Sequence, residues 1–274
     1  MALLVGIMGN EGRQSTGMRL VSWNVNGIRA VHNKGIFLDW LNRTRPDIVG
    51  LQETKASPDQ LDSSLLAPDG YQTFWSSATR KGYSGVALFT RVAPRSVTLG
   101  MGIPEYDDEG RTIIAEYDDF VFITAYFPNG GRDHLRVPFK MAYKDAFRRM
   151  INGYRAAGKS VIFCGDVNTS HQPIDLARPK QNEKTTGFLP EERVWLDQIL
   201  GEDGYIDTFR YKYPTTQKYS WWSAVTDARA RNIGWRLDYF IISPDLLPRL
   251  EEAEICDDVY GSDHCPVALT LSDR

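Results

Sequence analysis

The stretch RTIIAEYDDFVFITAYF, residues 111–127, decides the fold class of this chain. It holds two apolar runs, Thr112–Tyr117 and Val121–Tyr126, on either side of the polar pair Asp118-Asp119. Short apolar runs separated in this way are typical of a β-hairpin, which joins antiparallel strands. A doubly wound parallel sheet joins its strands through helices instead, so the stretch favours a sheet with antiparallel neighbours.

Short apolar runs recur along the rest of the chain and predict six further strands. They are Leu20–Trp23, Asp47–Leu51, Gly85–Thr90, Val161–Cys164, Leu237–Ile242 and Pro266–Leu271.

Helical patterns lie between some of these strands. One set of apolar residues shares a helix face after Gly35, a second set shares a face after Pro190, and a long helix is expected from about His134 to Tyr154. The two sets are Phe37, Trp40 and Leu41, and Leu196, Ile199 and Leu200. Strands, hairpins and helices mixed in this way predict an α/β fold in which two mixed sheets pack face to face with helices outside.

The composition is that of an ordinary globular protein. Of the 274 residues, 42% are hydrophobic and 24% are charged, which is enough for a sizeable core. The formal net charge is −3. A protein that coats nucleic acid by charge alone is strongly basic, so nucleic-acid binding would need a local basic patch. The odd set of cysteines, Cys164, Cys256 and Cys265, indicates buried thiols in a reducing compartment, and we expect a cytoplasmic protein.

We expect a single domain over residues 18–274, because no linker, charge block or low-complexity tract divides them. Residues 1–17 are expected to be a flexible leader or a cloning remnant. Their apolar run, Ala2–Met8, follows no positively charged segment and is too short for a signal peptide or a bilayer span. We therefore expect no membrane attachment.

One familiar motif is rejected. GYRAAGKS, residues 153–160, matches the phosphate-loop pattern G-x-x-x-x-G-K-[ST] letter for letter. Phosphate binding needs that loop to follow a strand and to open a helix, whereas here a helical segment precedes it and the strand SVIFC follows. A helix end at Gly158 and a short turn explain the sequence.

A weak internal similarity links LVSWNVN (20–26) with VIFCGDVN (161–168). Each runs from an apolar strand into a polar residue, then valine and asparagine. Polar side chains released at the end of a strand project into the rim of a sheet, where sites are usually built. The two halves of the chain could therefore be approximate structural repeats.

Polar groups stand at, or just beyond, the ends of the predicted strands: Asn24, Glu53, Asp166, Asn168, Asp238, Asp263 and His264. Taken singly, the asparagines could be turn formers, Glu53 a surface charge and Asp166 a helix N-cap. Asp238 is different, because it interrupts an apolar run and a buried carboxylate is costly unless it is paired. If Asp238 accepts a hydrogen bond from one ring nitrogen of His264, it fixes the tautomer and raises the basicity of the imidazole.

These residue types favour the hydrolysis of a phosphate ester. Glu53 and Asp263, with amide oxygens nearby, offer hard ligands that suit Mg²⁺, or Mn²⁺ as a substitute, rather than Zn²⁺. No serine nucleophile elbow, HExxH or paired CxxC pattern competes with them in the sequence. Such a metal neutralises the leaving oxygen while an acceptor activates water for in-line attack.

Six motifs in the sequence also resemble those of a known protein family. They are WNVNGIRA (23–30), PDIVGLQETK (46–55), YFPNGGR (126–132), CGDVNTSHQPIDLARPK (164–180), NIGWRLDYF (232–240) and GSDHCPV (261–267). In this order, and over nearly everything from Met18 to the end, the chain resembles the exonuclease III family of abasic-site DNA endonucleases. The broader endonuclease/exonuclease/phosphatase superfamily shares the Glu, Asp-x-Asn and Ser-Asp-His elements, but it is not expected to share LARPK or GWRLDYF.

The resemblance implies a four-layered, DNase I-like α/β sandwich. It also implies Mg²⁺-dependent cleavage of the phosphodiester 5′ to an abasic site, which leaves a 3′-hydroxyl, together with 3′→5′ exonuclease and 3′-phosphatase activity. The implied partner is duplex DNA with abasic or 3′-blocked sites, bound by a monomer.

The same resemblance implies a role for each matching residue. Glu53 would be the main metal ligand, with Asp263 and Asn24 close to the same ion and Asp166 and Asn168 adjoining it. Asp166 would orient or deprotonate the attacking water, and Asn168 would assist it. His264, held by Asp238, would contact the scissile phosphate, and Tyr126 would bind the phosphate or assist the leaving group. Whether Asp166 or His264 takes the proton stays open, as does the number of metal ions.

The DNA-binding side also has candidates. Arg132, Arg178 and Lys180 lie in loops and could contact phosphates. Asn129, in YFPNGGR, is implied by the resemblance. Trp235 and Leu237 stand at alternate positions and would face the same way on an extended chain. With Trp221 they could line an apolar pocket for a flipped-out deoxyribose, although a tryptophan-rich core is the simpler reading for some of the tryptophans.

Two positions depart from the pattern of some relatives. Asn26 stands where some carry aspartate, which removes a negative charge and could weaken metal binding. Val225 falls where some insert a larger wedge, which puts wedging in doubt.

Two other functions compete with the abasic endonuclease. A phosphatase or phosphodiesterase acting on a small or lipid phosphate is the runner-up, opposed by ARPK and the aromatic cluster. A non-catalytic nucleic-acid-binding relative is disfavoured because every expected metal and proton-transfer position holds a competent side chain.

Overall fold

The computed structural model describes residues 17–225 and 227–273. The expected leader therefore lies outside the described residues, apart from Gly17. Within the described ranges, no helix is long and apolar enough to cross a lipid bilayer.

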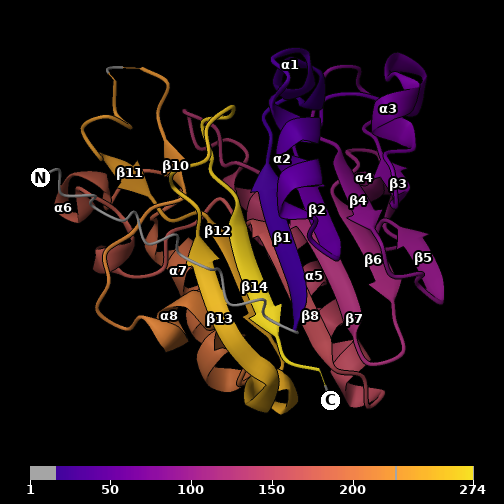
Figure 1. Cartoon of the computed structure of the whole chain (residues 1–274). Helices are drawn as coiled ribbons and strands as arrows, with labels where there is room; N and C mark the ends of the chain where they lie inside the picture. Colours follow the sequence, from indigo (N-terminus) through magenta and orange to yellow (C-terminus); the bar gives the residue numbers. More distant parts are fainter. Residues whose placement is uncertain (1–16, 226, 274) are drawn as a thin grey trace, which may run out of the picture.

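Two six-stranded mixed sheets form the centre of the molecule (Figure 1). The first has the order β13-β14-β1-β2-β4-β3, and these strands are Leu250–Ile255, Val267–Leu271, Met18–Asn24, Ile48–Gln52, Val86–Thr90 and Gln72–Ser76. The second has the order β5-β6-β7-β8-β12-β9, and these strands are Ser96–Leu99, Thr112–Glu116, Val121–Tyr126, Val161–Asp166, Asp238–Ile242 and Ile206–Asp207. A separate ribbon pairs β10 (Trp221–Trp222) with β11 (Gly234–Trp235). Each strand predicted from the sequence is present, and β6 and β7 form the predicted hairpin.

The two sheets repeat one pattern of strand pairing. In the order given above, each has two antiparallel pairs, then a parallel pair, then two antiparallel pairs. The parallel pair is β1–β2 in the first sheet and β7–β8 in the second, and in each pair helices join the earlier strand to the later one, so β2 corresponds to β8 in chain order. The similarity between LVSWNVN and VIFCGDVN predicts a repeat but matches β1 with β8, which is the wrong pair. All four central strands are buried runs that end in polar residues, so a short motif does not tell them apart.

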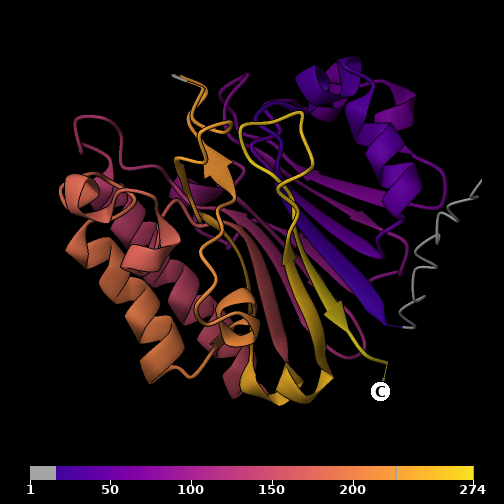
Figure 2. The same cartoon turned by 60° about the vertical axis from the view of Figure 1, so that its left-hand side comes forward.

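Helices cover the outer face of each sheet (Figure 2). On the first sheet lie α1 (Ile28–Asn33), α2 (Ile36–Thr44) and α3 (Ser63–Leu66). On the second lie α5 (Val137–Ala156) and α7 (Pro190–Asp197), which continues as a π-helix over Gln198–Glu202. The described residues thus form the expected sequence of helix, sheet, sheet and helix.

Short helices occupy the connections. They are α4 (Pro104–Asp107), α6 (Pro179–Asn182), α8 (Thr208–Lys212) and the 3₁₀ turns Pro58–Gln60, Pro173–Asp175 and Pro244–Arg249.

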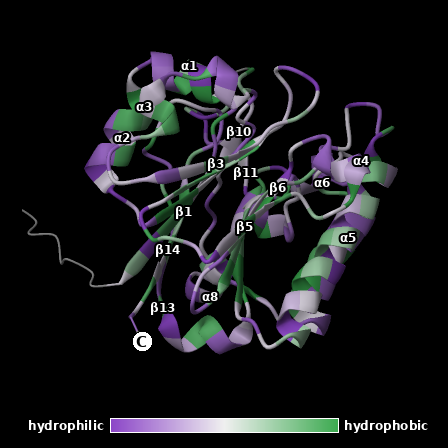
Figure 3. Cartoon of the chain, turned by 90° about the vertical axis from the view of Figure 1, so that its right-hand side faces the viewer, coloured by the Kyte–Doolittle hydropathy of each residue, from purple (hydrophilic) through white to green (hydrophobic). Residues whose placement is uncertain are grey.

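Three apolar layers hold these elements together, and Figure 3 shows green strands between helices whose exposed faces are purple. The middle layer fills the space between the sheets. The predicted helix faces point inward, since Phe37 and Leu41 of α2 and Leu196 of α7 are buried in the apolar layers beneath these helices. Burial of large apolar side chains is the dominant stabilising contribution to such a core.

The long helix begins three residues later than predicted. His134 has a φ of +62°, and α5 starts at Val137 with Pro138 in its first turn, where proline is well tolerated. At its other end Gly158 has a φ of +76° and Lys159 N donates to Tyr154 O, so GYRAAGKS is the predicted helix end and turn.

The parallel pairs bring the ends of β1, β2, β7 and β8 to one edge of the sandwich. Asn24 at the end of β1 donates from Nδ2 to Glu53, just after β2, and to Asp166 at the end of β8. Gly165 lets β8 lie close beside β7, because a Cβ there would stand 1.8 Å from Ala125 O. Side chains distant in sequence therefore meet at this edge.

Candidate active site

A pocket of about 450 Å³ opens at this edge, beside the β10–β11 ribbon. Ten residues proposed from the sequence line it: Glu53, Tyr126, Asn129, Asp166, Asn168, Trp221, Trp235, Leu237, Asp263 and His264. The lining also includes Asn26, Lys55, Thr185, Thr186 and Gly187.

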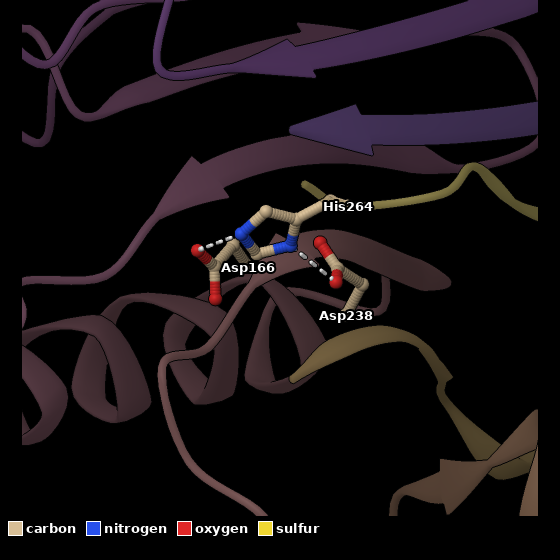
Figure 4. A group of neighbouring side chains, drawn as sticks. All are labelled: Asp166, Asp238 and His264. Atoms are coloured by element: carbon tan, nitrogen blue, oxygen red, sulfur yellow. Dashed lines mark hydrogen bonds and ion pairs between the residues drawn. The ribbon is translucent and has the colours of Figure 1, made fainter. Parts of the chain in front are cut away.

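His264 lies between two aspartates (Figure 4). Its Nδ1 is 2.8 Å from Asp238 Oδ2, as predicted, and its Nε2 is 3.7 Å from Asp166 Oδ2. Asp238 Oδ2 also accepts a hydrogen bond from Ser220 Oγ at 2.7 Å. Burial alone would lower the pKa of the imidazole, but Asp238 and Asp166 outweigh burial and raise the pKa of His264 to about 10. At neutral pH the ring is therefore an imidazolium.

Asp166 is 2% exposed and is the most unusual carboxylate of the pocket. Burial raises the pKa of Asp166 to about 7, against the opposing attraction of His264. Its oxygens accept hydrogen bonds from Asn24 Nδ2 at 2.9 Å and from Asn168 N at 2.8 Å. A carboxylate with this pKa is poised to accept a proton near neutral pH.

One ligand atom from each of Asp166, Asp238 and His264 lies within 4.8 Å of the other two, close enough to surround an ion. An imidazolium has no lone pair to offer a metal, so His264 is not a ligand in that form, whereas the carboxylate of Asp166 remains available to a cation. Further oxygen donors for a hard cation lie elsewhere in the pocket.

A second group of oxygens already binds a cation. The ammonium of Lys55 is 3.0 Å from Glu53 Oε1 and also contacts Asn26 Oδ1. Asn26 Nδ2 donates to Asp263 Oδ1 at 3.0 Å, and Trp221 Nε1 donates to Asp263 Oδ2 at 3.0 Å. Burial would raise the pKa of Asp263, but His264 and these donors lower it, so the carboxylate stays ionised. Carboxylate and amide oxygens of this kind fit Mg²⁺.

Asn24 is buried and connects the two groups of oxygens. Its Nδ2 is 2.9 Å from Asp166 Oδ2 and 3.1 Å from Glu53 Oε2, while its Oδ1 accepts from Asn26 N at 3.0 Å. It presents a donor rather than an oxygen to both carboxylates. Its predicted place near the ion fits this position, and its service as an oxygen ligand stays a prediction.

Two further residues are held in place by close contacts. Asn168 has a φ of +52°, donates from Nδ2 to Phe127 O at 2.9 Å and accepts from Asn129 Nδ2 at 3.0 Å. The guanidinium of Arg111 lies 4.9 Å from the Tyr126 ring centroid and donates to Tyr126 O at 2.9 Å. Burial, with Glu53 and Asp166 nearby, raises the pKa of Tyr126 well above 10, so its hydroxyl remains a hydrogen-bond donor.

An aromatic wall faces these polar groups. The Trp221 and Trp235 rings meet edge to face, with centroids 6.4 Å apart. Trp235 and Leu237 line the same pocket, as their alternate positions predict, whereas Trp222 packs into the core between the sheets. Gly187 packs against Trp235, since an added Cβ there would lie 3.3 Å from the Trp235 ring.

The remaining predicted residues do not line the pocket. Asn24 and Asp238 lie behind it, where they support Asp166 and His264. Arg132, Arg178 and Lys180 are exposed outside it, so their DNA contacts stay a prediction.

Sequence reasoning missed several functional groups. Lys55 stood within LQETK beside Glu53, and its position in the motif could have drawn attention to it. Residues 185–187 also line the pocket, and we call them the wall segment. This segment and Ser220, which supports Asp238, come from loops whose partners lie far along the chain. For these, no pattern in the sequence gave a signal.

Comparisons with known proteins identify the family and the fold of this chain. Residues 21–264 match the sequence profile of the Endonuclease/Exonuclease/phosphatase family. The chain is 44% identical to an exodeoxyribonuclease of Bacillus subtilis (strain 168), over 93% of this chain and 100% of that protein. It is 43% identical to the DNA repair nuclease APEX1 of Danio rerio, over 96% of this chain and 84% of that protein. Among solved structures, an AP endonuclease from Archaeoglobus fulgidus matches with a TM-score of 0.83 and 28% identity, over 93% of this chain and 100% of that one.

Proposed function

The chain belongs to the endonuclease/exonuclease/phosphatase family, and we propose that it is a Mg²⁺-dependent DNA repair nuclease that cleaves 5′ to an abasic site in duplex DNA. Removal of nucleotides and of phosphate from 3′ ends belongs to the same proposal. The relatives support it, because their names describe an exodeoxyribonuclease, a DNA repair nuclease and an AP endonuclease.

One observation carries the proposal. A buried carboxylate with a pKa near neutrality, an imidazolium and an aromatic wall line a single pocket. The first two groups suit phosphodiester hydrolysis. The wall suits an apolar sugar that has lost its base, since a flipped-out nucleotide is read by stacking and shape.

Asp166 is the proposed general base. Its carboxylate accepts the proton of the attacking water at Oδ1 or Oδ2, and Asn24 and Asn168 hold it in place. His264 cannot take this role at neutral pH, because Asp238 keeps its ring protonated. The imidazolium instead stabilises the charge that develops on the phosphoryl oxygens, and the Tyr126 hydroxyl donates to the same group.

Glu53 and Asp263, with Asn24, Asp166 and Asn168 nearby, are the residues we propose to hold Mg²⁺. The bound ion would neutralise charge on the leaving oxygen. Lys55 and Asn26 keep the two carboxylates in place through the contacts described above.

Trp221, Trp235 and Leu237 are proposed to receive the abasic deoxyribose, with Asn129 at the rim of the pocket. Arg132, Arg178 and Lys180 are proposed to contact backbone phosphates outside it, and a monomer is proposed to suffice. Each such phosphate contact should steepen the fall of affinity with salt.

Incubation with duplex DNA that carries one tetrahydrofuran site tests the proposal. Incision 5′ to that site with Mg²⁺, and loss of incision with EDTA, is the expected result. Turnover of inositol phosphates without DNA incision would favour the phosphatase alternative, and DNA binding without hydrolysis of either substrate would mean a non-catalytic binding protein.

A further inference from the structure

A fully buried ion pair lies beneath one wall of the pocket. Lys140 in the first turn of α5 and Glu192 in the first turn of α7 are both 0% exposed, and Lys140 Nζ is 2.7 Å from Glu192 Oε1. Taking two charges out of water is costly, and well-packed apolar residues are often as stable. Such a pair calls for an explanation beyond stability.

The carboxylate of Glu192 holds the wall segment. Its Oε1 accepts from Thr186 Oγ1 at 2.7 Å, and its Oε2 accepts from Gly187 N and from Leu189 N, the latter at 3.1 Å. A glutamate at this helix position commonly reaches back to the residue before the helix. Here it also fixes two residues that line the pocket.

The ammonium of Lys140 holds the catalytic side. Its Nζ donates to Asn168 O at 2.6 Å. The side chain of Asn168 in turn contacts Asp166, and Ser170 N donates to Gly187 O at 2.8 Å. The ion pair therefore joins the wall segment to the turn that carries Asn168.

The wall fits closely against the aromatic side of the pocket. Gly187 has a φ of +96°, and a Cβ added there would lie 3.3 Å from the Trp235 ring and 3.4 Å from Asn168 O. Gly187 therefore packs against the Trp235 ring, and a small displacement of Gly187 would let that ring shift in the pocket. Charge-assisted hydrogen bonds hold such a position more firmly than neutral ones.

We propose that Lys140 and Glu192 are positioning residues that hold Gly187 against Trp235 and so fix the place of that ring in the sugar pocket, and that the fixed ring makes the enzyme select an abasic site over an intact nucleotide. The proposal rests on the function proposed above. Gly187 packs against the Trp235 ring where that ring lines the pocket, so a deoxyribose without a base fits beside a fixed ring, whereas a nucleotide needs the ring and the wall segment to move. Steric exclusion depends on a rigid wall, and two buried charges supply that rigidity without touching the substrate.

The test compares Glu192→Gln, Lys140→Met and the double variant Lys140→Met/Glu192→Leu with the wild type. The measured quantity is the ratio of kcat/KM for incision at a tetrahydrofuran site to kcat/KM for cleavage at an intact nucleotide. We expect this ratio to fall about tenfold in each variant, since a discrimination of this size is what a pocket of fixed shape provides. The fall in this ratio should come mostly from a higher KM at the abasic site, while kcat at that site is nearly retained. If a lone buried charge unfolds the single variants, the apolar double variant still supplies a folded protein for the comparison. Lys140→Arg, which keeps the positive charge, should retain part of the wild-type discrimination ratio.

Arg148→Met is the matched control. Arg148 also lies on α5 and pairs with Asp203 at 2.6 Å and Glu202 at 2.8 Å, so its loss weakens the same packing of helices without touching the wall segment. The discrimination ratio should stay at the wild-type value. An equal fall in Arg148→Met would overturn the proposal, because it would mean that any loosening of α5 relaxes selectivity.

Amide hydrogen exchange separates this proposal from the function on which it rests. The amides of Gly187 and Leu189 donate to Glu192, so their exchange should be faster in Glu192→Gln and unchanged in Arg148→Met. A wild-type protein that does not incise abasic DNA would defeat the proposed function and the selectivity with it. An incising wild type whose Glu192→Gln variant keeps both slow exchange and full discrimination would overturn the positioning role alone.

Discussion

Two equivalent strands end in carboxylates that differ in their surroundings. β2 and β8 occupy the same place in the repeated pairing pattern of the two sheets. Glu53 follows β2 with a side chain 19% exposed and a lysine ammonium against it. Asp166 closes β8 with a side chain 2% exposed, between amide donors and His264.

The difference teaches how one scaffold supplies two kinds of acid group. A carboxylate that keeps some water and has a cation beside it suits metal binding. A buried carboxylate binds its proton more tightly and suits proton transfer. We therefore propose that the pocket combines a cation-binding side from the first sheet with a proton-accepting side from the second, and substitutions on the two sides should have different consequences.

The largest effect is expected for Asp166→Asn. Removing the proposed general base should lower kcat for incision by roughly 10²–10⁴-fold, which is the usual contribution of such a group. DNA affinity, measured by fluorescence anisotropy in EDTA, should stay close to that of the wild type. A variant that loses binding along with turnover would mean that Asp166 mainly supports the pocket.

The next effect concerns pH and the proton on His264. Asp166 works when deprotonated, so kcat should rise with pH through about 7, and His264 works when protonated, so kcat should fall as pH approaches about 10. Asp238→Asn removes the carboxylate that raises the pKa of His264, and the alkaline limb should move to lower pH. We expect kcat at pH 8 to drop by about tenfold to a hundredfold. An alkaline limb that does not move would assign it to another group.

The sequence predicted the fold and the contact between Asp238 and His264, and for a physical reason. Strands such as Val121–Tyr126 and Val161–Asp166 are continuous apolar runs, and Asp238 interrupts one, so burial and its cost are both visible in the sequence. Edge strand β5, Ser96–Leu99, is largely exposed and carries no such pattern. It went unpredicted because its pairing depends on β6.

The wall segment was unpredictable for another reason. The role of Thr186 and Gly187 comes from their contacts with Glu192 and Trp235, and Glu192 is paired in turn with Lys140. The chain brings these residues together from separate regions. Glu192 could be recognised as a helix-capping residue after Pro190, but its contact with a buried lysine could not. A sequence indicates single functional side chains, but it indicates the contacts between them only where a familiar motif contains both residues.

A smaller effect is expected on the cation-binding side. Glu53→Gln removes one charged ligand, so the Mg²⁺ concentration that gives half-maximal incision should rise about tenfold, while kcat at saturating Mg²⁺ changes much less. Mn²⁺ binding followed by electron paramagnetic resonance should weaken by a similar factor. Asp263→Asn serves as the companion variant, and an unchanged metal requirement in both would remove this side of the pocket from the proposed metal site.

The smallest effect is on stability, and it separates the two carboxylates without any assay of activity. The pKa of Asp166 rises from 3.8 in the unfolded chain to about 7 in the folded one, so the folded protein binds that proton more tightly and loses stability as pH rises through this interval. Asp166→Asn removes this loss. The variant should be more stable than the wild type at pH 8, by about 2 kcal/mol or roughly 5 °C in Tm, and no more stable at pH 4, where Asp166 is already protonated.

Glu53→Gln should change stability by less than about 0.5 kcal/mol at either pH, because its partly solvated charge contributes little. Calorimetry at the two pH values measures both variants. A gain for Asp166→Asn that is equal at pH 4 and pH 8 would mean that better packing, rather than relief from a buried charge, stabilises it, and the contrast between the two strand ends would lose its electrostatic basis.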